Sequence, residues 1–183
     1  MNTTPPRTRP SPPLARVALL GLLALVSNAC QAQPAVQPTA QPLLELSSFP
    51  RSELSITSSA GTQRYEIWLA DTPQRETQGL MFVRDLPASQ GMLFINKTPT
   101  PTPMSMWMKN TYIPLDMLFI DARGRIVRIF ARTTPHSLDL LADPMPVKAV
   151  LELRGGECEA RSIKVGDIVH HSAFRNTRMS RPR

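Results

Sequence analysis

The 183-residue sequence lacks the short motifs that mark the common enzyme classes. It contains no nucleophile elbow, no HExxH pair, no phosphate-cradling glycine loop and no CxxC pair. His170 and His171 are neighbours, but adjacent side chains in a strand point to opposite faces, so these two rings cannot chelate one metal together. These absences favour a protein without catalytic residues and without a bound cofactor.

Cysteine is scarce, since the chain has only Cys30 and Cys158. An oxidising compartment would allow a disulfide between them, whereas removal or lipidation of Cys30 would leave Cys158 as a lone thiol. Cys158 follows Gly155-Gly156-Glu157, where a helix start would lower a thiol pKa and the flanking glutamates would oppose that effect. We expect Cys158 to be buried and unreactive.

Long hydrophobic runs are also missing, and the one unbroken stretch, Val17–Val26, has ten residues. A membrane-spanning helix needs about 20 apolar residues, so this run fits the apolar part of a secretory signal instead. We therefore predict a signal peptide over residues 1–29 and an exported protein. Cleavage after Ala29, or a little later after Ala32, would release a soluble periplasmic domain. The next residue, Cys30, completes a lipobox-like tetrapeptide with Ser27 where Leu is usual, and a lipid there would tether the protein to a membrane.

The net charge of +7 belongs to the two ends of the chain. Three of the 21 basic residues lie in residues 1–29 and four follow His171, so 14 basic residues face all 14 acidic ones in between. The part expected to fold is formally neutral, and no nucleic-acid partner is predicted. We divide the chain into the signal peptide, a Pro/Gln/Ala-rich linker over 30–44, a single β domain over 45–172 and a basic disordered tail over 173–183.

The domain consists of short segments with the spacing of β strands. Residues 52–56 and 65–69 alternate around a turn that contains Gly61, which is typical of a hairpin. Thr72-Pro73 is a good helix start, so we expect a helix over about 73–81. Further expected elements are strands at 91–95, 147–153 and 168–170, a helical turn at 157–162, and loops at 98–103 and 132–143.

The segment 104–129 has the densest pattern. Residues 104–109 alternate as a strand, the alternation continues after Pro114, and the turn at 121–124 leads into a third apolar segment at 126–129. We expect two or three adjacent antiparallel strands here. The sequence thus contains seven or so short strands, only brief helices and no internal repeat. This pattern predicts a mainly β fold, which is a compact sandwich or open barrel with one or two short helices.

A series of motifs runs through residues 52–170. It comprises Gly79–Phe82, Arg84, Leu86-Pro87, Gly91–Phe94, Trp107–Thr111, Ile113–Asp121, Gly124, Ala149–Leu153 and Ile163–Asp167. Together these motifs resemble the domain-of-unknown-function family 192. The resemblance implies a compact, jelly-roll-like β domain, commonly behind a signal peptide, and no established activity. Glu76 and Gln78 replace the usual arginines, and Ser162 replaces a glycine that would suit a positive φ.

The polar run around Trp107 is the best candidate binding site. Strand alternation places Trp107 and Lys109 on one face, where an aromatic platform beside a cation suits a sugar, a carboxylate or a peptide end. The predicted ligand is an unknown small molecule. The candidate binding residues are Trp107, Lys109, Asn110, Thr111, Asp116, Arg84 and His136.

A structural interpretation of the same residues remains open. Asn110-Thr111 can satisfy backbone groups at a strand end, and Trp107 can be part of the core. Asp116 lies in an apolar run, and a buried carboxylate needs a partner such as Lys109 or Arg84. Lys109 could alternatively pair with Asp121 across the hairpin.

Methionine suggests an alternative function. Met104, Met106 and Met108 would lie along one face of a strand, and soft thioethers select Cu(I), which an exported protein would meet. The competing interpretation is that these side chains fill the core. A third alternative is an envelope structural or interaction module that presents an apolar β surface to an envelope protein.

Overall fold

The computed structural model describes residues 43–175 as a β-rich domain with two short helices. The signal peptide, Cys30, most of the linker and the end of the tail lie outside the described residues. After a 3₁₀ turn at Leu46–Ser48, the elements in chain order are β1 Arg51–Ser58, β2 Gly61–Ala70, α1 Pro73–Gln78, β3 Gln90–Ile95, β4 Ser105–Met106, β5 Leu115–Ile120, β6 Ile126–Phe130, β7 Leu141–Ala142, β8 Ala149–Arg154, α2 Glu157–Ala160 and β9 Ile168–His170.

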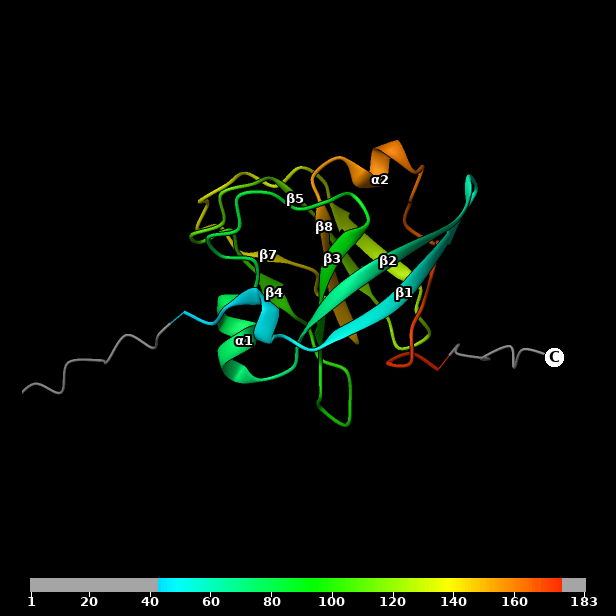
Figure 1. Ribbon diagram of the computed structural model, residues 1–183. Coiled ribbons are helices and arrows are strands. Elements are labelled where there is room, and N and C mark those ends of the chain that lie inside the picture. Colours follow the sequence, from blue (N-terminus) through cyan, green and yellow to red (C-terminus); the bar gives the residue numbers. More distant parts are fainter. Residues whose placement is uncertain (1–42, 176–183) are drawn as a thin grey trace, which may run out of the picture. The chain divides into compact units, whose positions relative to one another are not determined.

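Seven strands form one mixed sheet in the order β6-β5-β8-β3-β2-β1-β9 (Figure 1). All neighbours in the sheet are antiparallel except β2 and β3. The two outer strands approach each other as well, because Arg125 bridges Ile168 and the Ile126 N–H donates to the Asp167 carbonyl at 2.9 Å. The sheet is therefore nearly closed into an open barrel, which confirms the predicted mainly β class.

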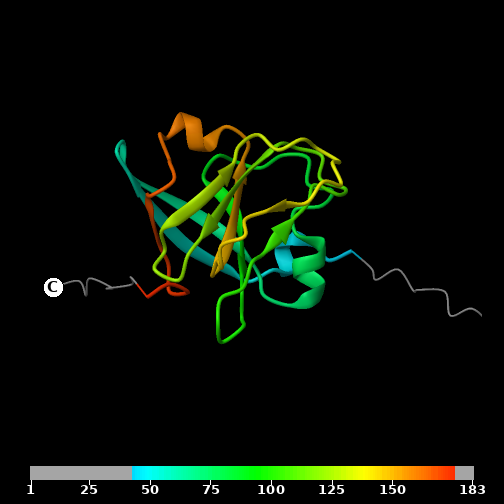
Figure 2. The same cartoon turned by 180° about the vertical axis from the view of Figure 1, so that it is seen from behind.

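The sheet separates two apolar clusters. All seven strands contribute to the cluster inside the barrel, through residues such as Leu54, Leu118 and Val169. The second cluster lies on the outer face of β3, β5 and β8, and Leu80 and Met108 cover that face. These three strands are buried on both sides, which explains their nearly continuous apolar sequences. In both views α1 lies on this outer side, far from α2 (Figures 1 and 2).

Most predicted elements are confirmed, but the strand expected at 104–109 is wrong. Only β4 is extended, and it pairs with β7 instead of β5. The strand ends because Met108 turns into the outer cluster and Asn110 adopts a left-handed conformation with φ 56°. The Thr111 N–H donates to the Met108 carbonyl at 3.0 Å and closes this turn.

The helix α1 is built as its sequence predicts, although it ends before residue 81. Thr72 caps it by accepting a hydrogen bond from the Arg75 N–H at 3.3 Å, and Pro73 occupies the first helical position. Gly79 ends the helix with φ 51°, and a Cβ there would lie 3.0 Å from the Phe94 ring. Glycine therefore lets α1 end close against β3.

The folded part extends slightly beyond the predicted bounds of 45–172. Gln78 holds Leu44, since its side chain accepts from the Leu44 N–H and donates to the Leu44 carbonyl, both at 2.7 Å. At the other end Phe174 is buried in the cluster inside the barrel. The domain therefore includes residues 43–44 of the predicted linker and residues 173–175 of the predicted tail.

Ser162 adopts the positive φ that the family pattern suggests, at 53°. Ser162→Gly is expected to raise the free energy of unfolding by about 0.5 kcal/mol, because relief of left-handed strain exceeds the added freedom of the unfolded chain. Urea unfolding measures the change. Ser55→Gly in β1 is the matched control and is expected to destabilise. An equal loss of stability in both variants would contradict the prediction.

Candidate functional site

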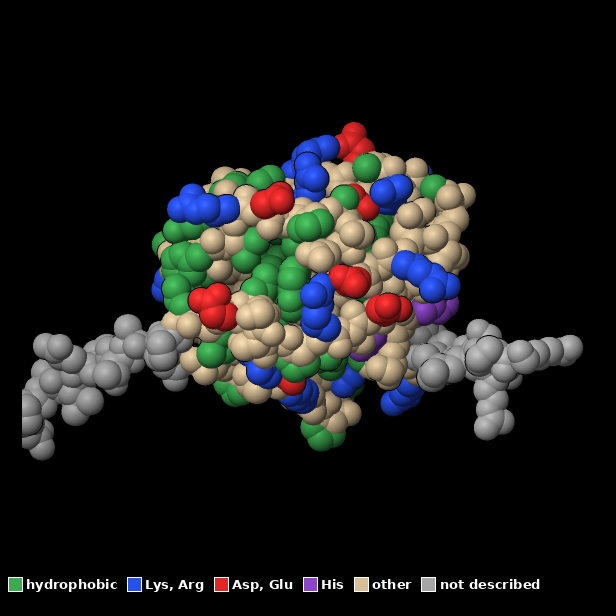
Figure 3. Space-filling model, in the orientation of Figure 1, with side chains coloured by type: hydrophobic (Ala, Val, Ile, Leu, Met, Phe, Trp, Pro, Cys, Tyr) green, Lys and Arg blue, Asp and Glu red, His purple; other side chains and the backbone are tan. Residues whose placement is uncertain are grey.

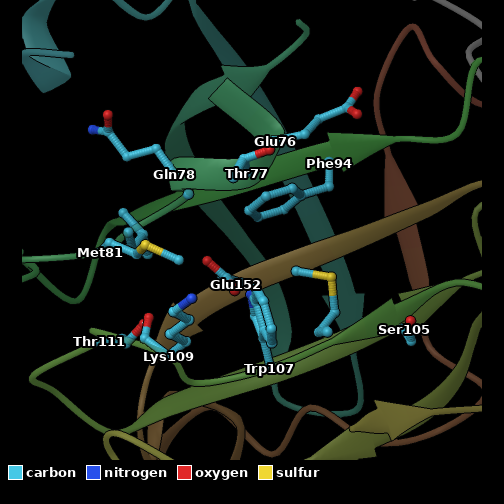
Figure 4. Close-up of a pocket in the computed structure, with 13 residues that line it drawn as sticks. Glu76, Thr77, Gln78, Met81, Phe94, Ser105, Trp107, Lys109, Thr111 and Glu152 are labelled. Carbon is cyan, nitrogen blue, oxygen red and sulfur yellow. The ribbon is translucent and has the colours of Figure 1, made fainter. Parts of the chain in front are cut away.

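A pocket of about 80 Å³ opens on the outer face of the sheet, between α1 and the segment that follows β4. A second pocket of about 650 Å³ adjoins it and shares Glu76, Phe94, Ser105 and Met106 as lining residues. Hydrophobic side chains gather on this face over β4 and β7 (Figure 3). The smaller pocket is lined by Glu76, Thr77, Gln78, Gly79, Leu80, Met81, Phe94, Ser105, Met106, Trp107, Lys109, Thr111 and Glu152 (Figure 4).

Glu152 forms the polar floor of this pocket. It lies on β8 between Met92 of β3 and Met117 of β5, and it is 4% exposed. Its Oε2 atom is buried and has no hydrogen-bond partner. Burial raises the pKa of Glu152 to about 8, because the ionised form loses its hydration. The carboxyl group points into the pocket (Figure 4).

Sequence reasoning missed Glu152 as a site residue. It appeared only within the family motif Ala149–Leu153, and the available signal was an acid in the middle of a strand with apolar neighbours on both sides. Such a residue must find a partner or remain un-ionised, which makes it a candidate for function.

Trp107 and Lys109 meet at the mouth of the pocket. Trp107 is 42% exposed, and the Lys109 Nζ atom lies 5.1 Å from the centre of its ring, which is within cation–π range. The predicted pairing of Lys109 with Asp116 or Asp121 is wrong, since among the described residues no ion pair joins Lys109 to either acid. The structure instead brings this platform and cation to the same cavity as Glu152.

Asn110 and Thr111 mainly shape the turn. The Asn110 carbonyl accepts from the Phe82 N–H at 2.9 Å, and the Asn110 side chain lies 4.0 Å from the Met81 sulfur. Thr111 is buried and lines the pocket, and its hydroxyl donates to the Lys109 carbonyl at 3.4 Å. These contacts fix the direction in which Lys109 points.

Asp116 lies away from the pocket lining. It is 0% exposed, and its carboxylate accepts from three backbone N–H groups, those of Arg132 at 2.8 Å, Gly156 at 2.9 Å and Cys158 at 2.8 Å. Backbone N–H groups are therefore the partners of Asp116, and the expected pairing with Lys109 or Arg84 is wrong. Through the bonds from Gly156 and Cys158, the Asp116 carboxylate links β5 to the start of α2.

Arg84 and His136 meet at a different place. The Arg84 guanidinium lies 4.7 Å from the centre of the Tyr112 ring, and the His136 ring packs against the same tyrosine at 5.2 Å. Phe82 completes the group with an edge contact to Tyr112. These residues form an exposed cluster that does not line the pocket, so the structure divides the predicted binding residues between two places.

The three methionines proposed for Cu(I) do not lie along one strand, because β4 covers only Ser105–Met106. Met104 and Met106 line the larger pocket and pack against the outer cluster. Met108 is buried within that cluster, and its sulfur accepts from the Thr133 hydroxyl at 3.1 Å. The predicted alignment is wrong because the strand ends at Met106. Within residues 43–175, no three His, Cys, Asp or Glu side chains are grouped to hold a metal ion.

Cys158 is buried, as expected, and among the described residues it forms no disulfide. Burial raises its pKa, and the neighbouring Asp116 carboxylate raises it further. Exposed apolar side chains, the feature that the interaction-module alternative predicts, occur at Leu138, Leu140 and Met145 before β8. No helix in the described part of the chain is long and apolar enough to cross a membrane.

The sequence of the domain matches the model of a known protein family. The profile of DUF192, described as "Uncharacterized ACR, COG1430", matches residues 55–171. The chain belongs to the DUF192 family. The match includes Lys109 and Glu152 and covers every strand of the sheet except the first four residues of β1. The resemblance drawn from the motifs is confirmed.

Two solved structures are similar to this DUF192 chain. One, from Sinorhizobium meliloti 1021, bears the name "putative transcription regulator"; it is 35% identical, with a TM-score of 0.66, over 69% of this chain and 98% of that one. The other, from Novosphingobium aromaticivorans DSM 12444, is described as a protein of unknown function; it is 33% identical, with a TM-score of 0.66, over 73% of this chain and 94% of that one. No curated protein matches the chain.

Proposed function

We propose that this DUF192 domain is a non-catalytic binding module for a small molecule, which it holds in the pocket above Glu152. One observation carries the proposal: a buried carboxyl with a free oxygen faces a cavity whose mouth has an exposed Trp107 beside Lys109. Ligand sites typically combine apolar walls with a few such convergent polar groups.

The polar groups of the pocket suit binding better than nucleophilic chemistry. The Thr77 hydroxyl donates to the Pro73 carbonyl at 2.8 Å, and the Thr111 hydroxyl donates to a backbone carbonyl as well. A hydroxyl nucleophile needs a base that removes its proton, and a carbonyl oxygen cannot serve as one. The two threonine hydroxyls are therefore used to hold the pocket walls.

Charge also favours a small molecule over nucleic acid. The name of the Sinorhizobium relative would suggest DNA binding, which depends on basic residues that neutralise phosphates. In this chain the 14 basic and 14 acidic residues between Cys30 and His171 balance. We therefore favour a pocket ligand over a DNA partner.

The proposal includes export of the protein. The apolar run Val17–Val26 and the small residues before Cys30 support a signal peptide, and the linker behind Cys30 would hold the domain off a membrane if that cysteine carries lipid. The mass of the mature N-terminus distinguishes soluble periplasmic release from lipid attachment at Cys30.

A thermal-shift screen of the full chain tests the binding function. The panel contains sugars, amino acids, carboxylic acids, amines and short peptides. At 100 times its dissociation constant a ligand stabilises the folded state by about 2.7 kcal/mol, so we expect one class to raise Tm by several degrees. The shift should be lost in Lys109→Met and Trp107→Leu.

Lys164→Met is the matched control, since Lys164 is an exposed lysine in a turn remote from the pocket lining. Its Tm shift should equal that of the wild type. The proposal is overturned if no compound in the panel raises Tm, or if the shift persists in both pocket variants.

A further inference from the structure

The unpartnered oxygen of Glu152 points to the chemistry of the ligand. In the described part of the chain only two buried side-chain N or O atoms lack a hydrogen-bond partner, this oxygen and the Nε atom of Arg75. Buried polar groups are nearly always hydrogen-bonded, so an orphan that faces a cavity suggests a partner supplied by a bound molecule.

The other ionisable groups of the pocket restrict what that molecule can be. Besides Glu152, the only ionisable residues that line the pocket are Lys109 and Glu76. The neighbours of Glu152 on β3 and β5 are uncharged, namely Met92 and Met117. Among the described residues no ion pair joins Lys109 to Glu152, so each can bond to a ligand in the pocket that both line. A cationic ligand would compete with Lys109, which already occupies the face of Trp107.

We infer that the pocket takes a small organic acid, whose carboxylate accepts hydrogen bonds from the Lys109 ammonium and from the carboxyl group of Glu152. This inference rests on the proposed binding function and specifies its ligand class. Both bonds are charge-assisted, and such bonds are shorter and stronger than those between neutral groups. The acid would satisfy the orphan oxygen and give Lys109 a counter-ion.

The protonation state of Glu152 supports this arrangement. Because burial raises its pKa to about 8, the carboxyl keeps its proton at neutral pH and can donate it in a hydrogen bond. An ionised Glu152 would repel a ligand carboxylate. Glu76 is exposed on α1 and lies at the rim shared with the larger pocket, so its charge remains hydrated.

The walls indicate the rest of the ligand. Leu80, Met81, Phe94 and Met106 surround the smaller pocket with apolar atoms, and the larger pocket continues beyond Phe94 and Met106. Apolar atoms of the ligand gain free energy when these walls remove them from water. The expected acid therefore has an apolar body of a few carbons or one ring.

Calorimetric titration of the full chain tests the inference with matched probes. The acids are butyrate and benzoate, the amines are butylamine and benzylamine, and the neutral analogues are butyramide and benzamide. We expect the acids to bind at pH 6 and to bind about tenfold more weakly at pH 9, because binding requires the proton on Glu152.

Variants separate this role from a structural one. Glu152→Gln keeps an N–H donor, so it should bind the acids with little change between pH 6 and pH 9. Glu152→Leu should weaken binding at least tenfold. Glu157→Gln is the control, since Glu157 is a buried glutamate whose partners are Tyr65 and Arg161 outside the pocket, and it should bind as the wild type does. Circular dichroism confirms that each variant is folded.

The outcomes distinguish the two claims. Binding of the amines, with loss in Glu152→Gln, overturns the acid inference and leaves the proposed binding function intact. Acid binding that ignores both pH and Glu152→Leu also overturns the inference. If none of these probes binds but the thermal-shift screen finds another class at Trp107 and Lys109, only the inference fails. If neither assay finds a ligand, both claims fail.

Discussion

Replacement of Asp116 by alanine is expected to lower the free energy of unfolding by about 4 kcal/mol or more. The Asp116 carboxylate is fully buried and accepts from the N–H groups of Arg132, Gly156 and Cys158. Its removal leaves these three donors without acceptors, and each buried orphan costs about 1–3 kcal/mol. Urea unfolding followed by circular dichroism measures the loss.

Asp121→Ala is the matched control. Asp121 also accepts from two backbone N–H groups, those of Arg123 and Arg125, but both bonds are at the surface, where water can replace the carboxylate. We expect a loss of about 1 kcal/mol there. Equal losses in the two variants would show that water reaches the three donors around Asp116, and the structural role assigned to that residue would then be wrong.

The strands could be predicted because their sequences carry local signals. β1 and β2 alternate around Gly61, and β3, β5 and β8 are apolar throughout because both faces are covered. The closure of the sheet could not be predicted. It depends on the bridge between Arg125 and Ile168 and on the parallel pairing of β2 with β3, which no local pattern encodes.

The candidate site could be predicted only in part. Trp107 and Lys109 were identified, but the strand that was expected to align them ends at Met106, and the turn at Asn110 brings them to the pocket instead. A left-handed asparagine gives no clear signal in a single sequence, because asparagine tolerates both signs of φ. The sequence therefore identified Trp107 and Lys109 as candidate binding residues but did not show how they are arranged.

Asp116 and Glu152 show where sequence reasoning stops. Both are acids in apolar strands, and the sequence does not show which one has partners. The donors to Asp116 include Gly156 and Cys158, 40 and 42 residues further along the chain, and they reach it only when α2 packs beside β5. Glu152 faces a cavity instead, and its Oε2 atom remains unpaired. Only the fold separates a structural carboxylate from a candidate binding group.

Glu152 is also expected to make the domain less stable as pH rises. Its folded pKa of about 8 lies above the ordinary value of 4.5, so in this interval the folded state keeps a proton that the unfolded state has released. The contribution of Glu152 to stability is complete below pH 4.5 and is lost progressively up to pH 8. At pH 7 the loss amounts to about 3 kcal/mol.

The difference in unfolding free energy between Glu152→Gln and the wild type isolates this effect, because the titrations of all other groups cancel. The difference should grow in favour of the variant by up to about 1.4 kcal/mol per pH unit and level off above pH 8. Glu152→Leu should give the same slope at a different absolute level, since it also removes the ionisation. A flat difference would mean that the folded domain ionises Glu152 as readily as the unfolded chain does. The pocket would then hold a carboxylate next to Lys109, which is the arrangement expected for a cationic ligand and not for an acid.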